Sequence, residues 1–136
     1  MNASQQPAVT RRSEQFSRMV AILVGLVFAA AGLWALLAPR SFFEGAAHFE
    51  PYNAHFIRDI GAFQLGLGAV LLLSAWLRDA LLVVLTGVAI GAVAHLASHV
   101  TDRHLGGDPA VDLPTFTVIA ALLIAAAVTR ARSQRR

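Results

Sequence analysis

Long apolar runs divide the chain, and the formal charges fall in the gaps between them. The runs cover residues 19–38, 60–77, 80–101 and 113–129, and none of them contains Asp, Glu, Lys or Arg. About 20 helical residues cross a bilayer core of about 30 Å. The pattern therefore predicts an all-α fold, a four-transmembrane-helix bundle with up-down topology.

Prolines and capping residues refine the bounds of these helices. Pro39 stops the first helix, and Asn53 is an N-cap residue for the second. Asp112 followed by Pro114 is typical of an N-cap with a first-turn proline, and it opens the fourth. The predicted helices are 17–38, 54–77, 80–100 and 113–129.

The distribution of arginine predicts the orientation, because loops on the cytoplasmic side of a membrane carry the excess of basic residues. With the N-terminus inside, the inner segments carry Arg11, Arg12, Arg18, Arg78, Arg130, Arg132, Arg135 and Arg136. The outer segments then carry Arg40, Arg58 and Arg103. Both termini are therefore expected in the cytoplasm, as a disordered tail over 1–16 and a basic tail over 130–136.

Composition narrows the class further. The chain is 57% apolar and 14% charged, too hydrophobic for a soluble domain of 136 residues. Its arginines lie at helix ends, as topology signals do, so they do not indicate nucleic-acid binding. Cysteine is absent, which excludes disulfides, thiolate metal sites and thiol redox chemistry. Basic residues that are all arginine, together with abundant alanine, are typical of a GC-rich bacterial genome, so we expect a bacterial cytoplasmic membrane.

The first outer segment, residues 40–52, is rich in aromatic side chains. Phe42, Phe43, Phe49 and Tyr52 alternate with charged residues and His48. This pattern suits a short amphipathic segment in the headgroup layer. Such a segment is also a surface on which a partner protein could dock.

All five histidines fall on the predicted outer side: His48, His55, His95, His99 and His104. In the third helix, Gly87, Gly91, His95 and His99 recur every four residues and share one face. The two glycines predict close packing against a neighbouring helix, as in small-xxx-small motifs. We therefore expect both histidines to point into the bundle.

The start of the second helix lies at the same membrane depth as the end of the third. His55, Arg58 and Asp59 are therefore expected beside His95 and His99. Ionisable groups at this depth usually face the bundle interior or a water-filled cavity. His48 and His104, in the flanking loops, are expected to be solvated.

This cluster is compatible with three ligand chemistries and with a structural role. His55, Asp59, His95 and His99 could hold a zinc or iron ion. His55 opposite His95 or His99 could ligate a haem from both faces. The same groups could hydrogen-bond a quinone carbonyl, or the cluster could simply fasten two helices together.

One motif resembles a known group of proteins. The run Asn-Ala-His-Phe-Ile-Arg-Asp-Ile-Gly-Ala-Phe over 53–63, with His-Leu-Ala-Ser-His over 95–99, resembles uncharacterised actinobacterial four-helix membrane proteins. The Arg58-to-Gly61 opening of the second helix and the architecture are also similar, more distantly, to DoxX-like proteins. Some DoxX relatives are associated with quinone-linked sulfur oxidation or oxidative-stress membrane complexes, so the resemblance implies a redox setting.

Two functions follow from these patterns. The first is a non-catalytic membrane subunit in which the cluster joins two helices and the aromatic segment contacts a membrane protein or a second copy of the chain. The alternative is a redox-associated protein that binds a metal ion, haem or quinone at the cluster. A transporter is the weakest interpretation, because the inner half of each predicted span lacks ionisable residues. The lipid bilayer is the expected partner in every case, and the sequence leaves open whether the protein is an enzyme.

Overall fold

The computed structural model describes residues 8–77 and 79–135, and within these ranges it contains helices and no strands. The elements are α1 (Ala8–Leu37), α2 (Pro39–Phe42), the π-helix η2 (Phe43–Ala47), α3 (Ala54–Ser74), α4 (Leu81–Thr101) and α5 (Pro109–Gln134). The helices α1, α3, α4 and α5 are each long and apolar enough to cross a membrane. The predicted fold, an all-α bundle of four transmembrane helices, is confirmed.

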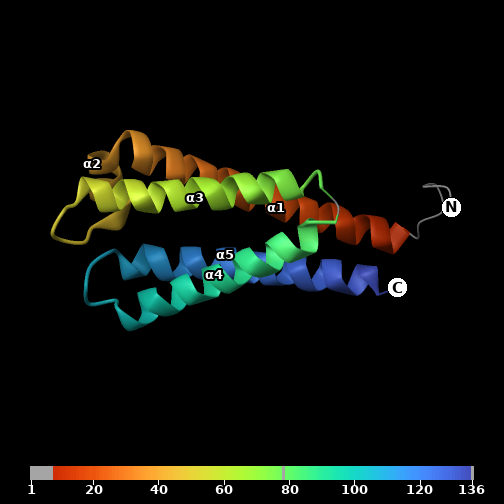
Figure 1. Ribbon diagram of the computed structural model, residues 1–136. Coiled ribbons are helices and arrows are strands. Elements are labelled where there is room, and N and C mark those ends of the chain that lie inside the picture. The colour runs from red at the N-terminus through yellow and green to blue at the C-terminus, as the bar shows by residue number, and fades with distance from the viewer. Residues whose placement is uncertain (1–7, 78, 136) are drawn as a thin grey trace.

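The four long helices form two antiparallel hairpins, α1 with α3 and α4 with α5 (Figure 1). The first residues of α1 and the last residues of α5 lie at one end of the bundle, here called the terminal end. The segment α2–η2 and the connection between α4 and α5 lie at the other, here called the loop end. Figure 1 shows that α3 and α4 diverge toward the loop end.

The start of α3 agrees with the sequence, but the start of α5 does not. Asn53 caps α3, because its Oδ1 accepts hydrogen bonds from the backbone N–H groups of His55 (3.0 Å) and Phe56 (3.2 Å). The predicted N-cap role of Asp112 is wrong. Asp108 caps α5 instead, with Pro109 in the first turn. Asp112 lies one turn further on and accepts a hydrogen bond from the Asp108 backbone N–H at 3.0 Å, so the two aspartates stabilise the longer helix reciprocally.

The predicted tails are helical over most of the residues that the structure describes in them. Residues 8–16 belong to α1 and residues 130–134 to α5, whereas residues 1–7 lie outside the described part of the chain. The physical reason is a set of contacts at the terminal end. The buried Ser17 hydroxyl donates to the Ala126 carbonyl oxygen at 2.9 Å. Glu14 lies 3.8 Å from Arg130 and 3.6 Å from Arg18, so charged groups that the sequence places in tails join α1 to α5.

Glycines bring the backbones of α1 and α3 into direct contact. A Cβ atom on Gly32 would lie 2.5 Å from the Leu65 nitrogen, and one on Gly68 would lie 2.6 Å from the Ala29 nitrogen. Gly61 and Gly25 approach the facing backbone almost as closely, so small residues are required on both helices. The first hairpin is therefore a tightly packed unit.

The buried core is divided unevenly along the bundle. The larger cluster draws on all four long helices and lies toward the terminal end; it comprises Val20, Ala21, Val24, Leu71, Ala75, Leu81, Leu85, Val88, Ala89, Leu123, Ala126 and Ala127. The smaller cluster at the loop end contains Ala35, Phe43 and Ile57, which all belong to the α1–α3 side. The α4–α5 hairpin therefore shares a core with its partner toward the terminal end, and the two hairpins separate at the loop end.

Candidate ligand-binding site

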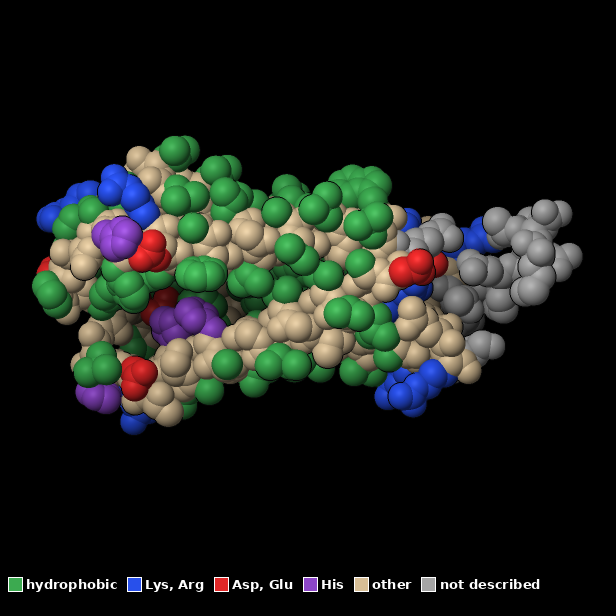
Figure 2. All heavy atoms as spheres, viewed as in Figure 1, with side chains coloured by type: hydrophobic (Ala, Val, Ile, Leu, Met, Phe, Trp, Pro, Cys, Tyr) green, Lys and Arg blue, Asp and Glu red, His purple; other side chains and the backbone are tan. Residues whose placement is uncertain are grey.

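A cavity of about 470 Å³ lies where the hairpins separate. Figure 2 shows it as a hollow between the two layers of helices, with histidine side chains inside it. Its lining includes side chains of α3, α4 and both loop-end connections: Ala47, Phe49, Phe56, Ile60, Ser98, His99, Asp102, Arg103, Leu105, Gly106, Gly107, Pro109 and Asp112. The cavity is therefore formed jointly by the two hairpins.

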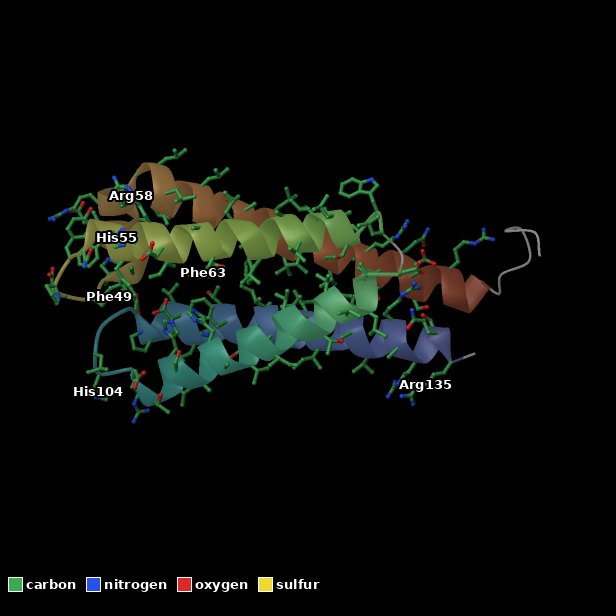
Figure 3. The ribbon with its side chains drawn as sticks, viewed as in Figure 1. Phe49, His55, Arg58, Phe63, His104 and Arg135 are labelled. Carbon is green, nitrogen blue, oxygen red and sulfur yellow. The ribbon has the colours of Figure 1, made fainter. Side chains whose placement is uncertain are left out.

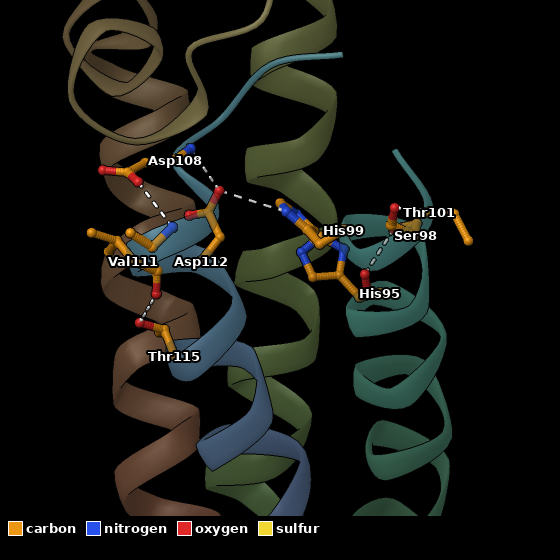
Figure 4. Close-up of polar contacts among 9 residues, drawn as sticks. His95, Ser98, His99, Thr101, Asp108, Val111, Asp112 and Thr115 are labelled. Atoms are coloured by element: carbon orange, nitrogen blue, oxygen red, sulfur yellow. Dashed lines mark hydrogen bonds and ion pairs between the residues drawn. The ribbon is translucent and has the colours of Figure 1, made fainter. Parts of the chain in front are cut away.

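His99 and Asp112 form the polar centre of this lining. The Nδ1 atom of His99 lies 3.6 Å from Oδ2 of Asp112, across the space between α4 and α5 (Figure 4). The side chains are 30% and 14% exposed, so both are largely shielded within the protein. Because Nδ1 faces the carboxylate, Nε2 is the ring nitrogen available to a molecule in the cavity.

Asp112 is held in place by the loop before α5. Its Oδ2 accepts the Asp108 backbone N–H, and a Cβ atom on Gly107 would come within 2.7 Å of the same oxygen. Gly107 has φ +80°, a conformation that favours glycine, so its small size and its backbone geometry both suit this position. The carboxylate is thus fixed before any ligand arrives.

The ring of Phe116 on α5 packs against both histidines of α4. The His95 and His99 rings lie 4.7 Å apart between centroids, and each lies 4.5 Å from the Phe116 ring of α5. These contacts explain why the i, i+4 pair on α4 packs toward α5. Of the two histidines, His99 lines the cavity, whereas His95 contacts Phe116 and stays exposed.

The opposite wall of the cavity is apolar. Phe49 and Phe56 make an edge-to-face contact at 5.8 Å, and Ile60 continues this wall one turn along α3. Phe43 contacts Phe49 and Tyr52 behind it. The site therefore offers a hydrogen-bonding side on α4 and α5 and an aromatic side on α3 and the preceding loop.

A short segment connects this aromatic wall to the end of α1. In α2, the Arg40 guanidinium bonds Glu44 at 2.6 Å and lies 4.9 Å from the centre of the Tyr52 ring. The hydrogen bond and the charge of Glu44 raise the pKa of Arg40 above its ordinary value. Residues 39–47 are helical, which agrees with an amphipathic segment in this region.

The structure does not assemble the cluster that the sequence suggests. His55 pairs with Asp59 at 3.5 Å on α3, and their side chains are 87% and 53% exposed. Arg58 is exposed as well, and none of the three lines the cavity. The physical reason is helix phase, because Phe56 and Ile60 occupy the cavity-facing side of α3. The predicted proximity of these residues to His95 and His99 is therefore replaced by contacts with Asp112 and Phe116.

The hypothetical four-ligand metal site is corrected by the same geometry. Within residues 8–77 and 79–135 there is no group of three or more His, Asp or Glu side chains placed to hold one metal ion. A haem held between α3 and α4 would need His55 on the cavity wall, where Phe56 lies instead. The polar side chains that line the cavity can donate and accept hydrogen bonds.

The packing role assigned to Gly87 and Gly91 is also wrong. A Cβ atom on either glycine would meet no other atom within 4 Å, so no helix packs closely against this face of α4. The close helix contact in this protein uses the glycines of α1 and α3 instead. The spacing on α4 was a typical packing signal, but the divergence of the hairpins leaves that face open.

Several residues of the site were not singled out from the sequence. Asp112 was interpreted only as a cap, and Phe116 and Arg103 carried no visible signal. His48 contributes its backbone, because its carbonyl oxygen accepts the Gly107 N–H at 3.2 Å. His104 lies in the loop between α4 and α5, outside the lining of the cavity (Figure 3).

The fold and the site define a small multi-pass membrane protein with a cavity at one end of its helices. Residues 16–111 match the family described as a domain of unknown function (DUF4345), and the chain belongs to this family. The match covers the histidines of α4 and ends just before Asp112. No curated protein and no solved structure matches the chain.

Proposed function

We propose that this membrane protein binds a small amphipathic molecule in the loop-end cavity, and that the molecule has a quinone head group. The observation that carries the proposal is the His99–Asp112 pair facing an aromatic wall inside one cavity. The distant similarity to DoxX-like proteins, some of which act with quinones, supports the same class of ligand.

The hydrogen-bonding capacity of His99 suits both redox forms of such a head group. A ring that carries a proton on Nε2 donates a hydrogen bond to a quinone carbonyl oxygen. A neutral ring with its proton on Nδ1 accepts a hydrogen bond from a quinol hydroxyl at Nε2. The rings of Phe49 and Phe56 supply edge or face contacts to the planar head group.

The charges around the cavity favour a neutral head group. Arg103 and Asp102 adjoin one another in sequence on the rim, and Asp112 faces His99 deeper inside. An anionic head group would meet two carboxylates as well as Arg103. A carbonyl or hydroxyl group can use these residues without adding a charge to the site.

The proposal includes a location and an orientation. The arginine distribution supports a bacterial cytoplasmic membrane with both termini inside, which puts the loop end and its cavity at the outer surface. His99 then lies close to the outer interface, where quinone head groups can be reached.

Fluorescence of the two tryptophans tests binding. Trp34 lies at the loop end, where its Nε1–H donates to the Ser41 hydroxyl at 3.2 Å, and Trp76 follows α3 at the terminal end, 72% exposed. Titration of the detergent-purified protein with decylubiquinone should quench fluorescence saturably. Trp34→Phe should remove the saturable component, whereas Trp76→Phe should retain it.

The matched pair His99→Ala and His55→Ala tests the site itself. Loss of His99 removes a hydrogen bond and a ring contact, so the affinity for decylubiquinone should fall about tenfold, which corresponds to about 1.4 kcal/mol. His55→Ala, at the same end but outside the cavity, should leave the affinity unchanged. Equal affinities of the two variants, or quenching that never saturates, would contradict the proposal.

A non-catalytic membrane subunit is the second candidate. The observation in its favour is the exposed group His55, Arg58 and Asp59, which the cavity does not use. A partner that recognises this group should be lost from native-gel complexes in the double variant His55→Ala, Asp59→Asn. Complexes of unchanged size in that variant would argue against this role.

A further inference from the structure

We infer that the ligand enters the loop-end cavity from within the bilayer, between α3 and α4, and that it therefore carries a long apolar tail. This inference rests on the proposed function and specifies the class of ligand. Three observations lead to it: a cover on the loop side of the cavity, an opening between α3 and α4, and the continuity of that opening with His99.

The loop side of the cavity is covered by two segments that contact each other. The Gly107 N–H donates to the His48 carbonyl oxygen at 3.2 Å, which joins the loop between α4 and α5 to the loop that precedes α3. A Cβ atom on Gly106 would lie 2.8 Å from the same oxygen and 3.0 Å from Phe49, so the two loops touch tightly. A ligand that came from water would have to pass beside this contact, among exposed charged residues such as Asp102 and Arg103.

The space between α3 and α4 near the loop end, by contrast, is not filled. Figure 2 shows the hollow and its histidine side chains between the two layers of helices, and Cβ atoms on Gly87 and Gly91 of α4 would each meet no other atom within 4 Å. Phe63, 77% exposed, lies on the side of α3 toward the gap between the hairpins (Figure 3). In a bilayer this side is reached from the acyl-chain region and not from water.

This open face leads directly to the polar centre of the cavity. Gly87, Gly91, His95 and His99 lie on one side of α4, and from His99 to Gly87 the helix axis rises about 18 Å. If the head group of the ligand lies at His99, its apolar tail can lie along Gly91 and Gly87. A helix of a second protein fits this space less well than an alkyl chain, because it would have to enter between α3 and α4.

Two probes and two variants test the inference. The probes are decylubiquinone, which has an alkyl tail, and its tailless dimethoxy-methyl-benzoquinone head group. Gly91→Leu fills the open face, whereas Thr86→Leu adds similar bulk on another side of α4, in an apolar groove shared with α5. We expect Gly91→Leu to weaken decylubiquinone binding about tenfold and to leave head-group binding unchanged. Thr86→Leu should leave the binding of both probes unchanged.

The remaining outcomes separate this inference from the proposed function. If both probes bind the wild-type protein and Gly91→Leu weakens neither, the cavity binds quinones but the tail does not follow α4. If Gly91→Leu weakens both probes equally, the substitution acts on the head-group site and lateral entry is overturned. If it dissociates a dimer seen by light scattering, a second copy occupies the face. If neither probe binds the wild-type protein, the proposed function itself fails.

Discussion

His99 of α4 and Asp112 of α5 face each other, with the Nδ1 and Oδ2 atoms 3.6 Å apart. The loop between the two helices separates them in the sequence. The capped loop at Asp108 fixes the carboxylate, and Phe116 contacts the ring of His99. Because the groups are held in this arrangement by the protein alone, the orientation of His99 does not depend on a ligand.

Removing the charge of Asp112 should impair binding through His99. In Asp112→Asn the amide oxygen can still accept the Asp108 N–H, so α5 should stay capped, but the ring of His99 loses the carboxylate that faces its Nδ1 atom. We expect the affinity for decylubiquinone to fall about tenfold, with an unchanged melting temperature. Fluorescence titration measures the first effect and thermal unfolding in detergent the second.

Asp59→Asn is the matched control, since Asp59 also faces a histidine, His55, but lies outside the cavity. Its affinity should equal that of the wild-type protein. A comparable loss in both aspartate variants would mean that charge at the loop end, and not the geometry of one pair, controls binding.

The close contact between α1 and α3 predicts a second effect. Gly68→Ala places a Cβ 2.6 Å from the Ala29 nitrogen, where backbone atoms cannot move aside without separating the helices. We expect a loss of stability of about 1–3 kcal/mol, observed as a lower melting temperature. Gly66→Ala on the same helix meets no atom within 4 Å and should be neutral or slightly stabilising, because alanine favours the helix. A lower melting temperature in Gly66→Ala alone would contradict the observed packing.

The ion pairs at the two ends of the bundle should differ in their contribution to stability. Glu14→Gln removes a carboxylate that is 12% exposed and lies beside both Arg130 and Arg18, so the two guanidinium groups lose a shared counter-charge. A loss of about 3 kcal/mol in the free energy of unfolding is expected.

Glu44→Gln is the control for that prediction. The Arg40–Glu44 pair is shorter, at 2.6 Å, but its side chains are 66% and 59% exposed, so solvent screens it. Its loss should lower the melting temperature much less than Glu14→Gln does. Equal destabilisation in the two variants would show that burial does not determine the strength of these pairs.

The orientation can be measured because the natural chain contains no cysteine. A membrane-impermeant maleimide added to intact cells should label His104→Cys at the loop end. Ser133→Cys, near the terminal end of α5, should react only after lysis. The reverse pattern would invert the proposed topology and place the cavity on the cytoplasmic side.

The sequence was sufficient to predict the four helices, because charge-free apolar runs of membrane-spanning length specify them directly. It also identified Asn53 as a cap, since that signal is local. It did not reveal which residues meet between helices. The direction of the chain predicts His55 and His95 at one depth, but helix phase turns His55 outward and leaves Phe56 and Ile60 on the cavity wall.

The glycines illustrate the same difficulty. Gly87 and Gly91 show the familiar four-residue spacing, yet Gly61 and Gly68, seven residues apart, make the close contact with α1. The spacing of glycines shows only which side of a helix lacks side chains. Whether a neighbouring backbone occupies that side depends on how the two hairpins diverge, and the sequence contains no local signal for this angle.

The shared core of the hairpins lies toward the terminal end, with Leu71, Leu85 and Leu123 fully buried within it. A small rotation of the α4–α5 hairpin about this core would displace its loop end by a larger distance, because the loop end lies far from the core. Separation of the hairpins beside His99 would leave this buried core intact, and the hydrogen bond between Gly107 and His48 joins the loops on either side of that space.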